Sequence, residues 1–456
     1  MSIMLISTFL VLLVPVCLYL RASCRSKNPA VLPTNWPILH MFPSFMANLH
    51  NLYDYFTLVL ARSGHNFRAH GPPGTGMRFF ITCDPANARH IFTTNHANFP
   101  KGTEFADIFE IMGGSLFTID GEPCRRQRAK AKSMLSSPRI VARLLSLDMP
   151  PMDAAVALDT VMEVGFFRLM MPASCWKSMR WLNIGPERKL DTARMVLREL
   201  VREMMEKRKI TSCRFGHGKE QESVDIISSF LEDPDYANVD LLHAVIISYM
   251  LAARDTIATT LTWIFYNLAQ NPNIVSIIRN ELSPIASRKV AVGVCTPVIF
   301  EPDETKSLVY LTATLYETLR LYPPAPVLRK TVAVDDIMPS GHEVHAGDTI
   351  FISVHSMGRM EAVWGKDCLD YNPHRWLSDD GNNLRYIPSH KFLAFNSGPR
   401  MCLGKDIAIM QMKTVIATTV WNFDVNLVEG QSIQPKPSII LEMENGLIVK
   451  LKKREI

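Results

Sequence analysis

Between about residues 46 and 325, apolar residues recur at three- and four-residue spacing, which predicts a run of amphipathic helices. Clear examples are the segments 84–94, 187–207 and 306–322. The longest such segment, 235–271, contains no Gly or Pro, is apolar on several sides and is followed by Pro272. This pattern predicts a long, buried helix that serves as the central axis of the protein.

The pattern changes after Pro323 and Pro324. Segments 331–354 and 423–451 are richer in Val, Ile and short turns than the preceding part of the chain. Such segments predict small sheets or hairpins. The expected fold class is therefore mainly α with a minor β region, in which the β segments lie beside a helical body.

The first 20 residues contain no charged side chain and are long enough to cross a bilayer as a helix. Because Arg21 and Arg25 follow directly, the positive-inside rule places the rest of the chain in the cytosol. A cleaved signal peptide is the alternative, although such peptides carry their positive charge before the apolar run. The expected organisation is an anchor at 1–20, a proline-containing connector at 21–45 and a single domain at 46–456.

Composition is that of an ordinary globular protein, with 47% hydrophobic and 20% charged residues. The 49 basic and 44 acidic residues give a net charge of +5, too small to predict a nucleic-acid-binding protein. Nine cysteines are spread along the chain without a CxxC pair. This argues against a disulfide framework or a cysteine-based zinc site and favours a reducing, cytosol-facing compartment.

The strongest candidate for chemistry is the segment 395–404, where Cys402 lies between Gly398 and Gly404 and just before a helical run at 405–420. A helix N-terminus and its backbone N–H groups are expected to lower the pKa of this thiol. The resulting thiolate would be a nucleophile or a metal ligand. A buried structural cysteine is an equally open interpretation of the residues alone.

Phe395, Gly398, Arg400, Cys402 and Gly404 resemble, position by position, the cysteine loop of the cytochrome P450 heme-thiolate monooxygenases. The resemblance implies the cytochrome P450 fold, with Cys402 as the axial ligand of the iron in heme (iron protoporphyrin IX). It also implies that Arg400 lies near a heme propionate and that the other three residues form the cofactor-binding loop.

Other segments are similar to the same family. Glu317 and Arg320 match its buried ion pair, and Arg375 matches the arginine that completes this structural ion network. Asp255 and Thr256, within the long helix, match the acid and alcohol that relay protons for oxygen activation. Without the resemblance, Glu317 and Arg320 would be a solvated pair, and the Thr256 hydroxyl could simply bond to its own helix.

A basic run at 124–132 predicts a charged helix face. The resemblance implies that Arg128 contacts one propionate and that Arg329 contacts another. It also implies that the remaining cations of this run attract an acidic flavoprotein, the NADPH-cytochrome reductase that supplies electrons.

Segments 176–185, 357–361 and 395–405 look most like the plant branch that contains fatty-acid omega-hydroxylases and mid-chain alkane hydroxylases. This likeness implies O2-dependent hydroxylation of a C–H bond in a long-chain aliphatic lipid, at the endoplasmic reticulum membrane. The apolar stretch 105–117 would be a wall of the substrate pocket or plain core.

Several positions depart from the family pattern. Cys124 occupies the place of a Trp that bonds a propionate, Ala253 replaces a Gly, and Ile257 replaces a hydroxyl residue. The segment between Lys132 and Asp153 is shorter by about two helices. Each Leu-sized side chain exposed by such a loss costs ~1.5–3 kcal/mol. We therefore expect an uncovered face on the long helix and poor heme binding. The alternative function is a catalytically inactive, truncated membrane-anchored remnant; a hydrolase with Cys402 as nucleophile lacks an evident histidine partner.

Overall fold

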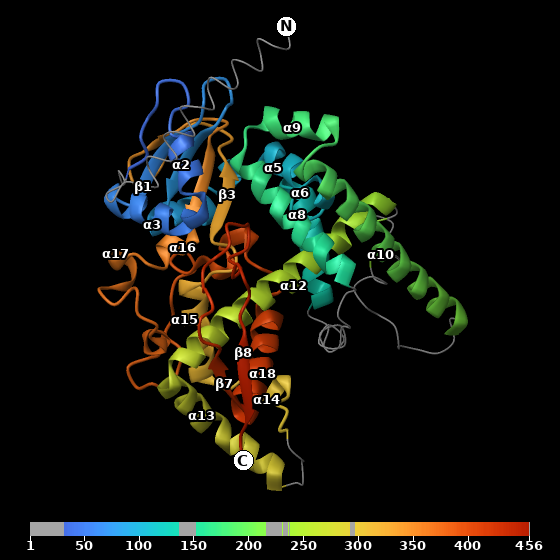
Figure 1. The fold of residues 1–456 in the computed structure, drawn as a ribbon, viewed down its shortest axis with the longest axis vertical. Helices are drawn as coiled ribbons and strands as arrows, with labels where there is room; N and C mark the ends of the chain where they lie inside the picture. The colour runs from blue at the N-terminus through green and yellow to red at the C-terminus, as the bar shows by residue number, and fades with distance from the viewer. Residues whose placement is uncertain are drawn as a thin grey trace.

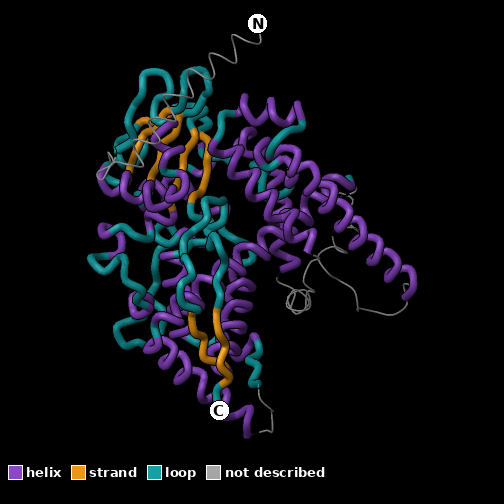
Figure 2. The backbone as a smooth tube through the Cα atoms, in the orientation of Figure 1, coloured by secondary structure: helices purple, strands orange, loops and turns teal. Residues whose placement is uncertain are grey.

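The computed structural model describes residues 32–135, 152–215, 230, 236, 238–291 and 297–455. Within these residues the chain is mainly helical, with three small sheets (Figures 1 and 2). The expected anchor at 1–20 and most of the shortened connection 133–152 lie outside the described residues. Pro43 and Ser44 are already buried in α2 (Phe42–Ala47), so the folded body begins within the expected connector.

The longer helices account for most of the body. They are α3 (Leu52–Arg62), α6 (Gly121–Leu135), α8 (Met152–Met170), α9 (Ala173–Leu182), α10 (Pro186–Phe215), α12 (Val239–Gln270), α13 (Pro272–Ala291), α15 (Val309–Leu321) and α18 (Lys405–Asn422). Short helices connect them: α4 (Pro85–Arg89), α5 (Gly102–Ile108), α14 (Pro302–Thr305), α16 (Val354–Met357) and α17 (Glu361–Trp364).

The long central helix predicted at 235–271 is α12. It begins at Val239 because the Asn238 side chain accepts hydrogen bonds from the backbone N–H groups of Asp240 and Leu241, at 2.9 and 3.2 Å. Figure 1 shows α12 running from the group formed by α5, α6, α8 and α10 into the half that contains α13, α15 and α18. The helix therefore belongs to both halves of the body.

Four strands form the largest sheet, in the order β1-β2-β6-β3. The strands are β1 (Asn66–His70), β2 (Arg78–Thr82), β3 (Val327–Thr331) and β6 (Thr349–Ser353), and only the β2–β6 pair is parallel. Two-stranded sheets are formed by β4 (Asp336–Ile337) with β5 (Glu343–Val344) and by β7 (Phe423–Leu427) with β8 (Val449–Lys453). The expected β regions are thus present, although the first begins at Val327. Its sheet also includes β1 and β2, which lie within the segment 46–325 that was predicted to be mainly helical.

Apolar side chains of α12 are buried in two different cores. Leu242, Val245 and Ile246 pack with residues of α8 and α10, whereas Ile264 and Leu268 pack with α13, α15 and α18. A third core lies between the four-stranded sheet and α3. The two ends of α12 are thereby fixed against different groups of helices.

The expectation that α12 has an uncovered apolar face is wrong. Val239 is the single large apolar side chain that α12 leaves strongly exposed, at 54%, among the residues that the structure describes. The more exposed Ala252, Ala253 and Ala258 are small and line a cavity. In the described part of the chain, α12 is also the one helix apolar and long enough to cross a membrane, but its packing is that of an interior helix.

Candidate active site

A cavity of about 2370 Å³ lies between α12, the cysteine loop and the sheet. Cys402 lines it from the loop before α18, and Thr256 lines it from the middle of α12. Phe105 and Phe117, from the apolar stretch 105–117, line it as well. Residues from the predicted catalytic motifs and from the predicted pocket wall therefore face one cavity.

Local backbone geometry shapes the cysteine loop. Gly398 has a φ of +60°, and a Cβ at this position would collide with the backbone carbonyl of Phe92. The N–H of Cys402 donates a 2.8 Å hydrogen bond to the carbonyl of Phe395, which closes the loop. Cys402 itself is exposed toward the cavity. The glycine that the motif requires is thus a position where no side chain fits.

The pKa of the Cys402 thiol is shifted in the direction opposite to the sequence-based expectation. Although Cys402 is exposed toward the cavity, the surrounding protein desolvates the thiol and raises its pKa, and this effect outweighs the backbone N–H of Gly404 and the charge of Arg128, which act in the opposite direction. The start of α18 therefore does not by itself produce a thiolate. A neighbouring cation or metal ion that stabilises the anion is needed for that charge state.

Several cations surround the cysteine loop. Arg128 on α6 donates a 2.6 Å hydrogen bond to the carbonyl of Met401, the residue before Cys402. Arg400 pairs with Asp120 and donates a 3.1 Å hydrogen bond to the carbonyl of Leu116. Both arginines line the cavity. Arg400 has the carboxylate of Asp120 as a partner, whereas Arg128 bonds to a carbonyl. The predicted propionate-binding residues are thus brought to the loop that carries the thiol.

Two lysines in this cluster were missed by sequence analysis. Burial, together with the charge of Arg400, lowers the pKa of Lys101 to about 7 and that of Lys330 to about 8. Lys101, Lys330 and Arg400 therefore gather several cations around the carboxylate of Asp120. The lysines are single residues in a loop and a strand, and no spacing in the sequence distinguishes them.

Arg329 and Lys330 are adjacent in β3 and therefore point to opposite faces of the strand. The guanidinium of Arg329 pairs with Glu104 and donates a 3.0 Å hydrogen bond to the hydroxyl of Thr349. Lys330 instead lies within the electrostatic range of Arg400 and Asp120. Both side chains line the cavity, but Arg329 already pairs with a carboxylate. Lys330 is therefore a second candidate for the propionate contact that was expected of Arg329 alone.

Heme fits this set of residues. A heme offers two propionates, which suit the cations Lys101, Arg128, Lys330 and Arg400, and an iron that accepts a thiolate such as that of Cys402. Apolar side chains supply most of the remaining wall. Cys124, at the position of the usual Trp, is buried on α6 and offers a weak thiol donor. Among the described residues there is no group of three His, Cys, Asp or Glu side chains suited to a metal ion.

The acid and alcohol of α12 lie in different surroundings. The Thr256 hydroxyl donates a 2.7 Å hydrogen bond to the carbonyl of Ala252 in its own helix, and Thr256 lines the cavity. Asp255 is 4% exposed and accepts a 2.7 Å hydrogen bond from Arg254 through Oδ1. Its Oδ2 is buried without a hydrogen-bond partner. Burial raises the pKa of Asp255 to about 6, although Arg254 opposes the effect.

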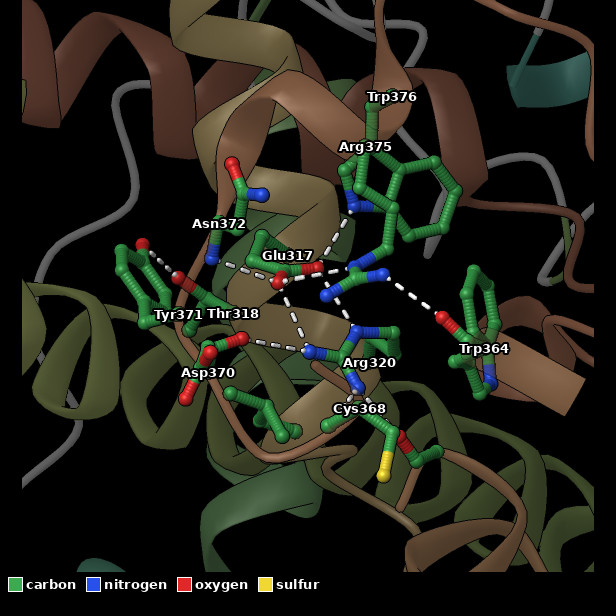
Figure 3. Close-up of polar contacts among 12 residues, drawn as sticks. Glu317, Thr318, Arg320, Trp364, Cys368, Asp370, Tyr371, Asn372, Arg375 and Trp376 are labelled. Atoms are coloured by element: carbon green, nitrogen blue, oxygen red, sulfur yellow. Dashed lines mark hydrogen bonds and ion pairs between the residues drawn. The ribbon is translucent and has the colours of Figure 1, made fainter. Parts of the chain in front are cut away.

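The predicted ion network is assembled away from the cavity, between α15 and the segment 364–376 (Figure 3). Arg320 Nε lies 2.8 Å from Glu317 Oε2, and Arg375 Nε lies 3.4 Å from Glu317 Oε1. Trp376 Nε1 also donates to Glu317 Oε2, at 2.9 Å. Arg320 further donates to the backbone carbonyls of Gly358, Cys368 and Asp370. The three residues singled out from the sequence are therefore in one buried cluster, joined by Trp376.

Comparisons with known proteins agree with this geometry. The sequence model of the family described as Cytochrome P450 matches residues 142–451. Alkane hydroxylase MAH1 of Arabidopsis thaliana is 32% identical over 98% of this chain and 98% of its own length. Cytochrome P450 86B1 of the same plant is 31% identical over 95% of this chain and 87% of its own. Noroxomaritidine synthase 1 of Narcissus pseudonarcissus is 32% identical over 96% of this chain and 94% of its own length.

The alignment with Alkane hydroxylase MAH1 spans 513 positions, more than the 456 residues of this chain. That relative therefore contains residues without a counterpart here, which agrees with the expectation of a shortened chain. A cysteine loop, a cavity suited to heme, a mainly helical fold and relatives aligned over nearly their full length all lead to one assignment. The chain belongs to the cytochrome P450 family of heme-thiolate monooxygenases.

Proposed function

We propose that this enzyme hydroxylates a C–H bond of a long-chain aliphatic substrate, a fatty acid or an alkane, with O2 and electrons from an NADPH-dependent reductase. The observation that carries the proposal is the apolar cavity that contains Cys402 and extends to residues of α2, α3 and the sheet. Phe42, Phe45 and Leu52 line it there, and Leu158 and Met162 line it from α8. Walls of this kind suit an extended hydrocarbon.

The residues of the cavity have distinct roles in this proposal. Cys402 holds the iron, and the heme, when bound, supplies the electron-rich iron centre that O2 activation requires. Arg128 and Arg400 hold the propionates, together with Lys330 or Arg329. Phe395, Gly398 and Gly404 shape the loop that carries Cys402. Asp255 and Thr256 move protons on α12, and the apolar wall excludes water from the substrate.

A relative's name supports the aliphatic substrate, since one protein of 32% identity is called an alkane hydroxylase. Identity alone does not select it, because the noroxomaritidine synthases are equally similar. Substrate binding distinguishes an enzyme that resembles the alkane hydroxylase in its substrate from one that resembles the noroxomaritidine synthases. A series of unbranched alkanes and fatty acids should shift the heme spectrum of the purified enzyme on binding, with affinity that rises with chain length. Spectral binding of compact aromatic amines in place of the alkyl series would contradict the proposal.

Membrane attachment completes the proposal: residues 1–20 anchor the enzyme in the endoplasmic reticulum, and the catalytic domain faces the cytosol. The apolar and uncharged character of these residues supports this topology. Exposed Arg125 and Arg126 on α6 suit an acidic reductase surface. A chain that begins near Ser23 should be released from membranes by a salt wash. Its quantitative sedimentation with membranes would show that another surface anchors the protein.

Product formation in a reconstituted system tests the reaction itself. The full chain, heme and the plant reductase should convert an unbranched alkane or fatty acid to an alcohol, with NADPH consumed. The inactive-remnant alternative predicts no heme absorbance and no product. Heme content therefore separates the two functions before any substrate is chosen.

A further inference from the structure

Arg254 connects two helices through two carboxylates. Its Nη1 lies 2.7 Å from Asp159 Oδ1 on α8 and 2.7 Å from Asp255 Oδ1 on α12. The Asp159 side chain is 52% exposed, whereas that of Asp255 is 2% exposed. One guanidinium is thus shared between a carboxylate in contact with solvent and a carboxylate inside the protein.

The buried end of this bridge is incompletely satisfied. Asp255 Oδ2 is buried and has no hydrogen-bond partner, so the carboxyl group keeps one oxygen free to hold or pass a proton. The charged groups that face Asp255 are Arg254 from its own helix, Asp159 from α8 and Glu442 from the C-terminal segment. Arg254 favours the carboxylate, while the two acids oppose it.

The exposed end of the bridge lies on α8, a helix whose other side chains line the cavity. Leu158, next to Asp159, lines the cavity, as do Met162 and Phe166 further along α8. A hydrocarbon that presses on these side chains therefore acts on the helix that carries Asp159. Because the ion pair joins α8 to α12, a small displacement of α8 changes how Arg254 is divided between the two carboxylates.

We propose that Arg254 is a positioning residue that couples the placement of α8 against the substrate to the charge of Asp255, through its shared contact with Asp159. The proposal rests on the proposed function, in which Asp255 moves protons for the reaction. Arg254 does not touch the reacting atoms. Its effect is electrostatic and depends on where its guanidinium lies.

Two substitutions should shift the titration of Asp255 in opposite directions. Arg254→Gln removes the cation that favours the carboxylate, so the midpoint should rise from about 6 by ~1 unit or more. Asp159→Asn removes a repelling charge and leaves Arg254 to Asp255 alone, so the midpoint should fall. Arg254→Lys keeps the cation and should titrate near the parent. If Arg254 only held the two helices together, the two substitutions would not shift the midpoint of Asp255 in opposite directions.

The experiment is an infrared pH titration of the full-length, heme-loaded enzyme. The carboxyl band of Asp255 is identified as the band that disappears in Asp255→Asn. Asp240→Asn is the matched control, because it breaks another ion pair of α12, the 3.0 Å contact between Arg198 on α10 and Asp240, far along the helix. The control should leave the midpoint unchanged. Hexadecane, added as the probe, should move the midpoint in the parent and not in Asp159→Asn.

Opposite shifts in the two variants, with a hexadecane effect that Asp159→Asn abolishes, would support the proposal. Shifts in the same direction, no shifts, no band lost in Asp255→Asn, or no hexadecane effect in the parent would each overturn it. The proposed function is judged separately, by the carbon monoxide spectrum and product formation. An enzyme that has the thiolate spectrum and forms the alcohol but lacks the opposite shifts would refute the coupling alone.

Discussion

Arg320 Nε lies 2.8 Å from Glu317 Oε2, and neither side chain exposes any surface. A second contact of 2.8 Å between Arg320 Nη2 and Glu317 Oε1 makes the pair bidentate. The backbone carbonyl of Arg320 also lies so close to Gly358 that a Cβ there would collide with it. Two charges in the interior are thus satisfied on all sides, which ties α15 to the segment that follows Gly358.

Removing one partner of this pair should be costly, because the other charge remains buried. Arg320→Ala is expected to destabilise the protein by ~3–5 kcal/mol. The matched control is Arg202→Ala, which breaks the pair of Glu199 and Arg202 with the same spacing on the exposed surface of α10. The control should leave the unfolding midpoint almost unchanged. Chemical denaturation of both variants checks the prediction, and equal losses would show that burial does not set the cost.

The cysteine loop should not tolerate a side chain at Gly398. Gly398→Ala places a Cβ against the Phe92 carbonyl, so we expect the loop to shift and heme content per protein to fall severely. Gly347→Ala is the control, since its φ is also positive, at +84°, but its Cβ would meet only Arg78, at 3.6 Å. Gly347→Ala therefore carries the energetic cost of a side chain at positive φ without a steric collision. Full heme content in Gly398→Ala would contradict the structure of the loop.

Asp255 should make stability depend on pH. Its pKa is about 6 in the folded protein, against ~3.9 for an unperturbed aspartate. Between these values the folded state binds more protons than the unfolded chain, so stability falls as pH rises and stays lower above about 6. Asp255→Asn removes this penalty. Its stability relative to the parent should therefore increase by ~2–3 kcal/mol on going from acidic to neutral pH, and a pH-independent difference would refute the burial effect.

Lys330 should contribute to heme retention more than its neighbour Arg329. Loss of a charged hydrogen bond to a propionate costs ~1.5–3 kcal/mol, so Lys330→Met should release heme at least about tenfold more readily. Arg329→Met should lower stability, because it leaves Glu104 and Thr349 without their partner, and should affect heme release less. Transfer of heme to an excess of apomyoglobin measures both. Faster release from the Arg329 variant alone would restore the assignment made from the sequence.

Short motifs explain which parts of the site could be predicted from the sequence. The cysteine loop is contiguous, and Glu317 and Arg320 are three residues apart on one helix, so local spacing carries the information. Lys101, Lys330 and the contact of Arg254 with Asp159 depend on which distant segments meet. The spacing of residues along the sequence does not predict these contacts between distant segments.

Two expectations failed because one local effect was considered without its surroundings. A helix N-terminus favours a thiolate, but desolvation of the Cys402 thiol by the surrounding protein raises its pKa more strongly. A shortened connection was expected to expose α12, but the packing of α8 and α10 covers its large apolar side chains within the described residues. In both cases the tertiary environment outweighed the local signal.

The absorption spectrum of the reduced, carbon monoxide-bound protein tests the central claim most directly, because that spectrum reports whether a thiolate binds the heme iron. The parent chain should give the thiolate-type spectrum. Cys402→Ser should lose it, since a neutral hydroxyl does not replace the electron-donating sulfur. A parent without this spectrum, or a Cys402→Ser variant that keeps it, would show that Cys402 is not the iron ligand.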